Sequence, residues 1–223
     1  MPACHSQSYT QDHSQGHSQS YSQDFAIILA AGFSTRMGVC KTTLPWHNHQ
    51  TLLHYQTAQF LQAAITPIVV LGSHNAHRQV DCAPGSQVVV KLEGDRSKTK
   101  TILTGLAHLP EDVSTITLSA VDQPRAASVY KALLQISKQD KALITAPYYQ
   151  GKLGHPVVFS HRLLSNLKNI SDESLGVRKL MQSSSAQIKK VAFSTPEILI
   201  DLNDALAYQS ERHTETLRGA WKH

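Results

Sequence analysis

Cysteine is scarce in this chain of 223 residues, and its three cysteines lie far apart. Cys4, Cys40 and Cys82 form no Cys-x-x-Cys spacing, which zinc sites and many redox sites require. We therefore expect neither a zinc site nor a disulfide framework. Unpaired cysteines are typical of proteins in a reducing compartment, so we expect a cytoplasmic protein.

Long hydrophobic runs are also missing. No apolar stretch approaches the roughly 20 residues of a membrane-spanning helix, so we expect no membrane partner. The chain has a net charge of +5, which suits an anionic partner such as a nucleotide or a phosphate group. Its basic residues are scattered, without the stripe of arginines and aromatics typical of nucleic-acid binding. Nucleic acid is thus the weaker alternative, and we expect no such partner.

The first 24 residues contain almost no aliphatic side chains and neither lysine nor arginine. They repeat Ser-Gln between histidines and tyrosines. A segment of this composition buries too little apolar surface to offset the entropy cost of ordering, so we predict a disordered tail over residues 1–24. Its lack of basic residues and of an apolar core segment is not typical of signal or transit peptides.

Short apolar runs alternate with helix-period segments after this tail. We predict strands over residues 25–30, 66–72, 86–92, 114–121 and 141–147, and helices over residues 51–64, 99–109 and 126–137. The strand segments are nearly continuously apolar and rich in Val and Ile, as in sheets that are buried on both faces. The pattern predicts an α/β fold with a mostly parallel sheet and right-handed crossovers.

Residues 142–160 interrupt this alternation. Their sequence, ALITAPYYQGKLGHPVVFS, predicts two strands joined by a short glycine-containing loop, a small antiparallel part of the sheet. Helices near residues 161–168 and 172–182, a strand near 187–193 and a run at 197–203 are expected to complete the domain.

The stretch LAAGFSTRMGVCK, residues 29–41, follows the first predicted strand. Gly32 and Gly38 lack the intervening glycine of the dinucleotide-binding fingerprint. Two residues separate Gly38 from Lys41, so the loop of nucleoside triphosphatases is absent as well. A third layout stays open, in which small residues approach a nucleoside while Arg36 and Lys41 supply positive charge to phosphates. The alternative is an ordinary surface loop with solvated charges.

These 13 residues match Leu-Ala-Ala-Gly-x-Ser-x-Arg-Met-Gly-x-x-Lys, the pattern of nucleotidyltransferases that make nucleoside-diphosphate conjugates. Within that superfamily the chain resembles the molybdenum cofactor cytidylyltransferases, from about residue 25 to residue 208. Further similar segments are KTTLPWHNHQTLLHY, KTKTILTGLAHLP, AVDQP, GKLGHPVVF, LGVRKLM and LIDLNDALAY. Asp-Gln-Pro together with Gly-His-Pro selects this narrower family.

The resemblance implies a single-domain, Rossmann-like three-layer fold of the nucleotide-diphospho-sugar transferase type. It implies a nucleotidyltransferase domain over residues 25–210 and a C-terminal extension over 211–223. The implied reaction moves CMP from CTP to a phosphorylated acceptor, a molybdopterin-type cofactor, and releases pyrophosphate. A phosphate acceptor is largely ionised near neutral pH, so charge neutralisation and positioning matter more than a general base. A Mg²⁺ cofactor and a molybdoenzyme partner are also implied.

Roles are carried over by matching positions. Lys41, Arg36 and Asp122 are the expected catalytic residues, with Lys41 at the α-phosphate and the leaving pyrophosphate. Asp122 follows a buried strand and is expected to bind Mg²⁺, the alternative being a helix cap. Asn203 is the expected second metal ligand, with Asp201 as its rival. The expected nucleotide-binding residues are Leu29, Ala30, Ala31, Gly32, Ser34, Arg36, Lys41, Thr101 and Asp122.

The resemblance implies that His155 and Arg178 bind the acceptor. For each, a structural role stays open: His155 as a packed turn residue and Arg178 as a solvated helix residue. Two positions depart from the family pattern. Val121 replaces a glycine before Asp-Gln-Pro, and Asp172 lies farther from Gly176 than the family's aspartate does.

Three alternatives compete with cytidylyl transfer to a molybdopterin. The first alternative is transfer of GMP from GTP. Ala31 favours CTP over GTP, because relatives that transfer GMP have glycine there, although one methyl group is worth only about 1–3 kcal/mol. The isoprenoid-precursor cytidylyltransferases share a segment similar to RSKTKTILTGL but have Asp-Ala-x-Arg-Pro where this chain has Asp-Gln-Pro. The third alternative is a cofactor escort protein without turnover.

Overall fold

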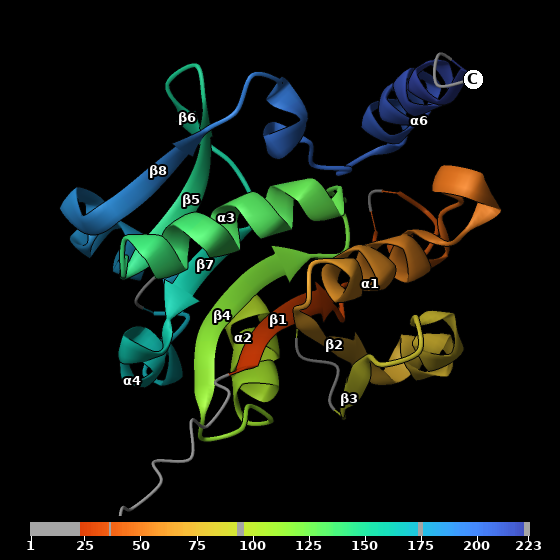
Figure 1. Ribbon diagram of the computed structural model, residues 1–223. Coiled ribbons are helices and arrows are strands. Elements are labelled where there is room, and N and C mark those ends of the chain that lie inside the picture. Colours follow the sequence, from red (N-terminus) through yellow and green to blue (C-terminus); the bar gives the residue numbers. More distant parts are fainter. Residues whose placement is uncertain (1–22, 36, 93–95, 174–175, 221–223) are drawn as a thin grey trace, which may run out of the picture.

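The computed structural model describes residues 23–35, 37–92, 96–173 and 176–220. Within these ranges, eight strands form one sheet (Figure 1), in which the strand order is β3 (Gln87–Lys91), β2 (Thr66–Gly72), β1 (Gln23–Ala30), β4 (Val113–Ala120), β7 (Val157–Ser160), β5 (Ile144–Tyr149) and β6 (Lys152–Leu153). Strand β8 (Ile188–Ala192) also pairs with β5.

The sheet is mostly parallel, as predicted. Strands β3, β2, β1 and β4 pair in parallel, and β8 pairs in parallel with β5. Strand β7 is antiparallel to both β4 and β5, and β6 folds back on β5. The antiparallel part expected over residues 142–160 is therefore present, and β7 is inserted between β4 and β5.

Helices cover both faces of the sheet. The α-helices are α1 (Leu52–Gln62), α2 (Lys98–Leu106), α3 (Ala127–Gln139), α4 (Leu164–Lys168), α5 (Val177–Ser183) and α6 (Ala205–Ala220). The 3-10 helices are η1 (Lys41–Thr43), η2 (His47–His49), η3 (Ser73–Asp81), η4 (His161–Leu163), η5 (Ser185–Gln187) and η6 (Pro196–Leu199). Helices α1 and α3 pack on one face, and α2 and α4 on the other (Figure 1).

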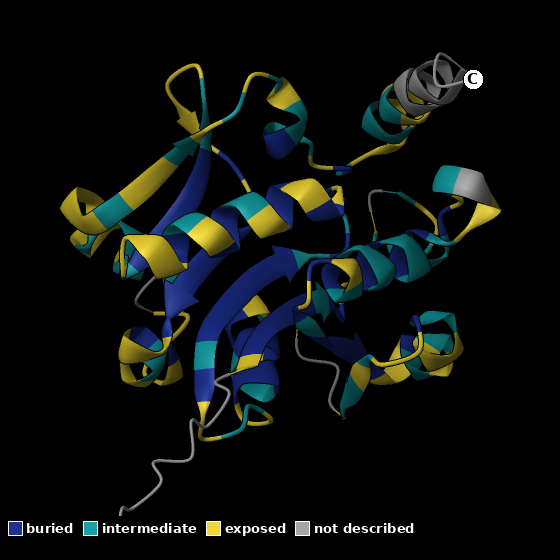
Figure 2. Ribbon diagram, viewed as in Figure 1, coloured by how far each residue is buried: buried dark blue, intermediate teal, exposed yellow. Residues whose placement is uncertain are grey.

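The side chains of β1 point alternately to the two faces of the sheet, and each face has its own hydrophobic core. Phe25 and Ile27 point into the cluster beneath α2 and α4, whereas Ala26, Ile28 and Ala30 join the cluster beneath α1 and α3. The sheet is consequently buried on both sides, and exposed positions gather on the outer helix faces (Figure 2). This explains why the strand segments are continuously apolar rather than alternating.

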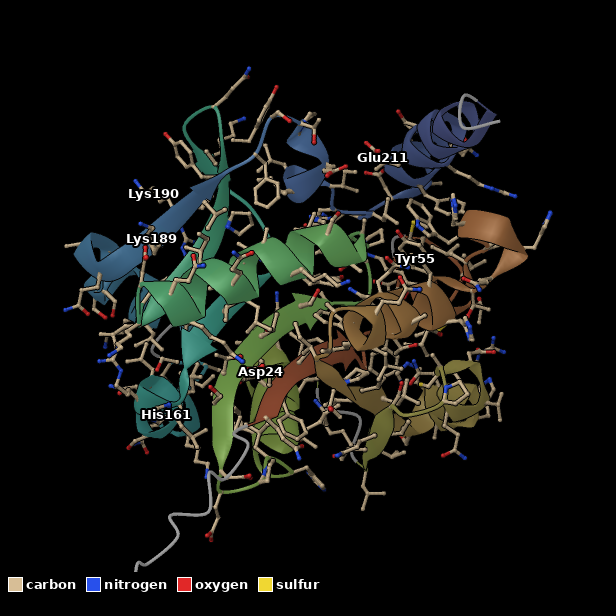
Figure 3. All side chains as sticks on the ribbon, viewed as in Figure 1. Asp24, Tyr55, His161, Lys189, Lys190 and Glu211 are labelled. Carbon is tan, nitrogen blue, oxygen red and sulfur yellow. The ribbon has the colours of Figure 1, made fainter. Side chains whose placement is uncertain are left out.

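The predicted boundaries of the tail and of the helix near residues 172–182 are wrong. Strand β1 begins at Gln23, so Asp24, the last residue of the predicted tail, lies within the sheet (Figure 3). Helix α5 begins at Val177 and not near residue 172, because Gly176 precedes it with a φ of +55°, outside the right-handed helical region. The rest of the predicted tail lies outside the described residues.

At the other end, α6 spans the expected boundary between the domain, which was to end at residue 210, and the C-terminal extension, which was to begin at residue 211. None of the helices in the described ranges combines the length and the apolar composition needed to cross a bilayer.

Candidate active site

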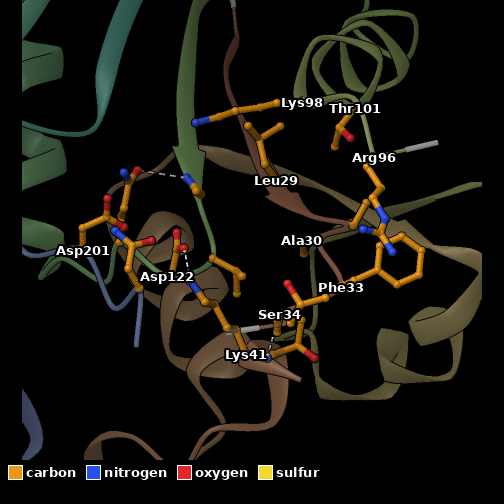
Figure 4. Close-up of a pocket in the computed structure, with 18 residues that line it drawn as sticks. Leu29, Ala30, Phe33, Ser34, Lys41, Arg96, Lys98, Thr101, Asp122 and Asp201 are labelled. Atoms are coloured by element: carbon orange, nitrogen blue, oxygen red, sulfur yellow. Dashed lines mark hydrogen bonds and ion pairs between the residues drawn. The ribbon is translucent and has the colours of Figure 1, made fainter. Parts of the chain in front are cut away.

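A cavity of about 360 Å³ opens at the carboxyl ends of β1 and β4 (Figure 4). Open α/β sheets bind their ligands at this edge. The residues that line it are Leu29, Ala30, Ala31, Gly32, Phe33, Ser34, Thr35, Lys41, Thr42, Arg96, Lys98, Thr101, Ala120, Val121, Asp122, Gln123, Asp201 and Asn203. It thus gathers all the expected nucleotide-binding residues except Arg36, which lies outside the described residues.

The loop after β1 folds back so that Lys41 enters the cavity. Ser34 has a φ of +51°, and its carbonyl accepts a hydrogen bond from the Met37 amide at 2.9 Å. Its hydroxyl accepts a second one from the Lys41 amide at 3.1 Å. Gly38, with a φ of +68°, supplies the left-handed turn between them, which a side chain would disfavour. The serine and the second glycine of the motif therefore aim its lysine.

The Lys41 ammonium meets the Asp122 carboxylate, with Nζ and Oδ2 2.6 Å apart. Both side chains are largely buried, with exposed fractions of 11% and 17%. A charge-assisted bond of this length joins residues 81 positions apart in the sequence. Asp122 does not cap α3, whose N-cap is Ala126 without a side-chain bond. The cap alternative is therefore wrong.

Buried amides fix the turn that carries Asp122. Gln56, from α1, donates from Nε2 to the Ala120 and Gln123 carbonyls at 2.9 and 3.2 Å. Gln123 in turn accepts from the Ala120 amide at 3.2 Å through its side chain. The glutamine of the Asp-Gln-Pro motif is thus structural. Val121, which replaces a glycine, packs with the core beneath α1 and α3.

The segment LIDLNDALAY, residues 199–208, lies directly against this turn. Leu202 is fully buried, and its amide donates to the Asp122 carbonyl at 2.9 Å. Its neighbours Asp201 and Asn203 consequently both line the cavity. Asp122 and Asp201 lie on the same side of the cavity in Figure 4.

These side chains fit a hard divalent cation. Mg²⁺ prefers oxygen donors, takes one or two carboxylates and keeps sites for water and phosphate. Asp122, Asp201 and Asn203 offer that donor set. Among the described residues, no cluster of three or more His, Cys, Asp and Glu side chains forms a complete metal cage. A site completed by phosphate oxygens and water is the arrangement that this donor set fits.

The model of the MobA-like NTP transferase domain family matches residues 26–190. The chain belongs to this family. Membership agrees with the motif of the first loop, and it makes the protein a nucleotidyltransferase of the MobA-like superfamily. No match was found among curated proteins.

Solved structures of similar proteins share the fold of this MobA-like transferase. Rv0371c from Mycobacterium tuberculosis is 24% identical, with 86% of this chain and 98% of that chain covered and a TM-score of 0.74. A nucleotidyl transferase from Methanothermobacter thermautotrophicus is 21% identical, with 88% and 99% covered and a TM-score of 0.73. CMP:2-keto-3-deoxy-manno-octonic acid synthetase complexed with CTP is 13% identical, with 88% and 100% covered and a TM-score of 0.69. At these identities the similarity establishes the fold alone.

Two basic residues of the transferase cavity were not predicted from the sequence. Arg96 and Lys98 reach it from the start of α2, on the side opposite to Lys41 (Figure 4). The Arg96 guanidinium carbon lies 5.2 Å from the centroid of the Phe33 ring, which stacks on His74 at 4.2 Å. Arg96 and Lys98 could have been predicted, because they are basic residues at the start of a helix that follows a strand. Phe33 occupies a variable position of the motif and gave none.

Thr101 and Asn75 support the walls of the cavity. The Thr101 hydroxyl donates to the Ser97 carbonyl at 3.0 Å, so its proton is used within α2. Asn75 is buried and donates to the Ala30 carbonyl at 2.9 Å, while its Oδ1 accepts from the Gly72 amide at 2.8 Å. Asn75 therefore ties the end of β1 to the end of β2, a role that the sequence did not indicate.

The expected acceptor residues lie outside the cavity lining. His155 is exposed next to a cis peptide bond with Pro156. Partial loss of solvent around its ring lowers the pKa of His155, and the positive charges of Lys98 and Arg125 lower it further. Arg178 is exposed on α5, and Asp172 is exposed before it. The structure thus does not bring His155 and Arg178 together at the cavity.

Proposed function

We propose that this protein transfers CMP from CTP to a phosphorylated acceptor, a molybdopterin-type cofactor, and releases pyrophosphate. The observation that carries the proposal is the Lys41–Asp122 pair, which lines the same cavity as Asp201 and Asn203 at the carboxyl edge of the sheet. It brings a cation for phosphate oxygens next to oxygen donors for a metal ion.

In the proposed reaction, an oxygen of the acceptor phosphate attacks the α-phosphorus of CTP. A bond forms between that oxygen and the α-phosphorus, while the bond from the α-phosphorus to the bridging oxygen breaks and pyrophosphate leaves with its electron pair. Lys41 exchanges Asp122 for the phosphate oxygens and stabilises the charge that develops there. Arg36 is the expected partner of the β- and γ-phosphates. No general base is required, because the acceptor is already ionised.

Asp122 and Asn203 are the proposed ligands of Mg²⁺, with Asp201 as the rival of Asn203. Bound there, Mg²⁺ would neutralise negative charge on the triphosphate. A structure of Rv0371c in complex with manganese supports a divalent ion in a protein of this fold.

Two observations favour CTP. The Ala31 methyl group lines the cavity where relatives that transfer GMP have glycine, and it would crowd a purine. Similar solved structures also include a synthetase complexed with CTP and a 4-diphosphocytidyl-2C-methyl-D-erythritol synthase. Arg96 and Lys98 add positive charge for the triphosphate or for the anionic acceptor.

Thermal unfolding in the presence of CTP, GTP, ATP and UTP, each with and without Mg²⁺, tests the nucleotide half of the proposal. A ligand at 100 times its dissociation constant adds about 2.7 kcal/mol, which raises the unfolding midpoint by several degrees in a domain of this size. We expect this shift with CTP and Mg²⁺. A GTP-selective shift would keep the mechanism but move the protein to guanylyl transfer. No shift with any nucleotide would favour an escort protein instead.

The acceptor half is tested by pyrophosphate release from CTP. We expect release with molybdopterin and none with methylerythritol phosphate. The reverse result would assign the protein to isoprenoid-precursor synthesis.

A further inference from the structure

Arg125 is a buried arginine directly behind the Asp-Gln-Pro motif. Its exposed fraction is 3%, and burial lowers its pKa to about 10, so the guanidinium remains charged at neutral pH. Within the described part of the chain, no carboxylate lies within ion-pair distance of it. A buried charge without a counter-ion is costly unless hydrogen bonds satisfy it. Its position therefore calls for an explanation.

Backbone carbonyls satisfy the guanidinium instead. Nη1 donates to the Pro124 carbonyl at 2.7 Å, and Nε donates to the His155 carbonyl at 3.1 Å. Nη2 donates to the carbonyls of Ile198 and Ile200, at 2.9 and 2.7 Å. One planar group thus joins three segments of the chain that are distant in the sequence.

Each of these segments carries part of the candidate active site. Pro124 ends the turn that presents Asp122, His155 lies on the proposed acceptor side, and Ile200 precedes Asp201 and Asn203. The segments also contact one another, because the His155 amide donates to the Ile198 carbonyl at 3.0 Å and the Leu202 amide to the Asp122 carbonyl at 2.9 Å. Arg125 does not line the cavity; its guanidinium bonds to all three segments from behind and fixes their relative positions.

We infer that Arg125 is a positioning residue, which sets the spacing between Asp122 and the Asp201–Asn203 segment and thereby the affinity of the cavity for a divalent cation. This inference rests on the proposed function. A lysine cannot replace the planar guanidinium, because its ammonium is a point donor that does not reach the four carbonyls of these three segments. Groups that orient metal ligands from behind typically contribute about 10- to 100-fold to metal affinity.

Mn²⁺ binding to the full-length protein tests the inference without any turnover. Free Mn²⁺ gives a six-line electron paramagnetic resonance signal that bound ions lose, so a titration yields the dissociation constant. We expect Arg125→Lys to bind Mn²⁺ about 10- to 100-fold more weakly than the wild type.

Arg162→Lys is the matched control. Arg162 also donates from Nη2 to a backbone carbonyl, that of Lys141, but it does so on η4 and not behind the cavity. We expect its Mn²⁺ affinity to stay within about two-fold of the wild type, the size of an ordinary surface change. An equal loss in Arg125→Lys and Arg162→Lys would overturn the inference, since the effect would then be general destabilisation.

Two further variants separate the remaining outcomes. Asp122→Asn should lose Mn²⁺, which identifies the cavity as the site that is measured. If Asp122→Asn loses Mn²⁺ and Arg125→Lys retains it, the inference fails and the proposed function stands. If the wild type binds no Mn²⁺ with or without CTP, both fail. Arg125→Gln, which keeps amide donors, replaces Arg125→Lys if the latter does not fold. Failure of both variants to fold would assign Arg125 to the fold alone and reject the positioning role.

Discussion

In the proposed reaction, Lys41 and Asp122 each bind a different part of a metal–nucleotide complex. An ammonium binds phosphate oxygens, and a carboxylate binds a hard cation such as Mg²⁺. They satisfy one another at 2.6 Å, so neither charge is left unpaired in a largely buried position. Binding of a nucleotide would exchange one set of charge partners for another, which limits the cost of desolvating the site.

Replacement of Lys41 tests this at the scale of one residue. We expect Lys41→Ala to lower turnover by about 100-fold or more, the usual effect of losing one preorganised electrostatic group. Initial rates of pyrophosphate release at saturating CTP measure it. Lys131→Ala, which removes an exposed lysine on α3, is the control. Turnover near the wild-type rate in Lys41→Ala would refute the role of this residue.

Single residues of the site were predictable where they belong to one continuous motif. Lys41 and Ser34 lie in the first loop, and the resemblance of its motif to the nucleotidyltransferase pattern predicted both. Arg96, Lys98 and Phe33 were missed, because their proximity depends on how α2 packs against the loop after β1. Arg125 follows a recognised motif, yet nothing in its neighbours indicates that it binds the carbonyls of residues 155, 198 and 200.

At the scale of elements, the strands of the parallel part were predictable because burial on both faces leaves a continuous apolar run. The insertion of β7 between β4 and β5 was not, since strand order depends on pairings such as Thr117 with Val158, far apart in the sequence. The start of α5 was also misplaced, because the φ of Gly176 is set by tertiary structure. The local hydrophobic pattern thus predicts which helices and strands form, whereas tertiary packing determines the strand order in the sheet and where the elements end.

The close contact between η6 and the Gly-His-Pro segment gives a prediction at this scale. A Cβ at Gly154 would lie 2.2 Å from the Ile198 carbonyl oxygen and 2.4 Å from Ile198 Cδ1, so the backbone must move. We expect Gly154→Ala to lower the free energy of unfolding by about 1–3 kcal/mol, the usual cost of overpacking. Urea denaturation measures the change.

Gly32→Ala is the control for this substitution, because a Cβ at Gly32 would meet nothing within 4 Å. Its free energy of unfolding should stay within about 0.5 kcal/mol of the wild type. Equal stability of Gly154→Ala and Gly32→Ala would show that η6 yields at no cost, and that its carbonyls do not fix the segment.

At the scale of the whole molecule, the cavity lies where the two parts of the sheet meet. Strands β1 and β4 of the parallel part supply the loop with Lys41 and the turn with Asp122. The segment that follows β8 and η6 supplies Asp201 and Asn203. Helix α3 packs on β7 and η6 through Val129 and Leu133 and so joins the two parts. Loss of order in either part should therefore affect the site.

The start of the folded domain gives the last prediction. Asp24 is 8% exposed; it accepts a hydrogen bond from the Thr115 hydroxyl at 2.8 Å and pairs with Lys138 Nζ at 2.6 Å. We expect removal of residues 2–22 to leave the unfolding midpoint and the turnover unchanged. Removal of residues 2–24 also deletes this carboxylate and leaves its partners without it, which should cost about 1–3 kcal/mol. Asp24→Asn in the full chain should reproduce most of that loss. Equal midpoints of the two truncated proteins would show that the domain begins after Asp24, as the composition had suggested.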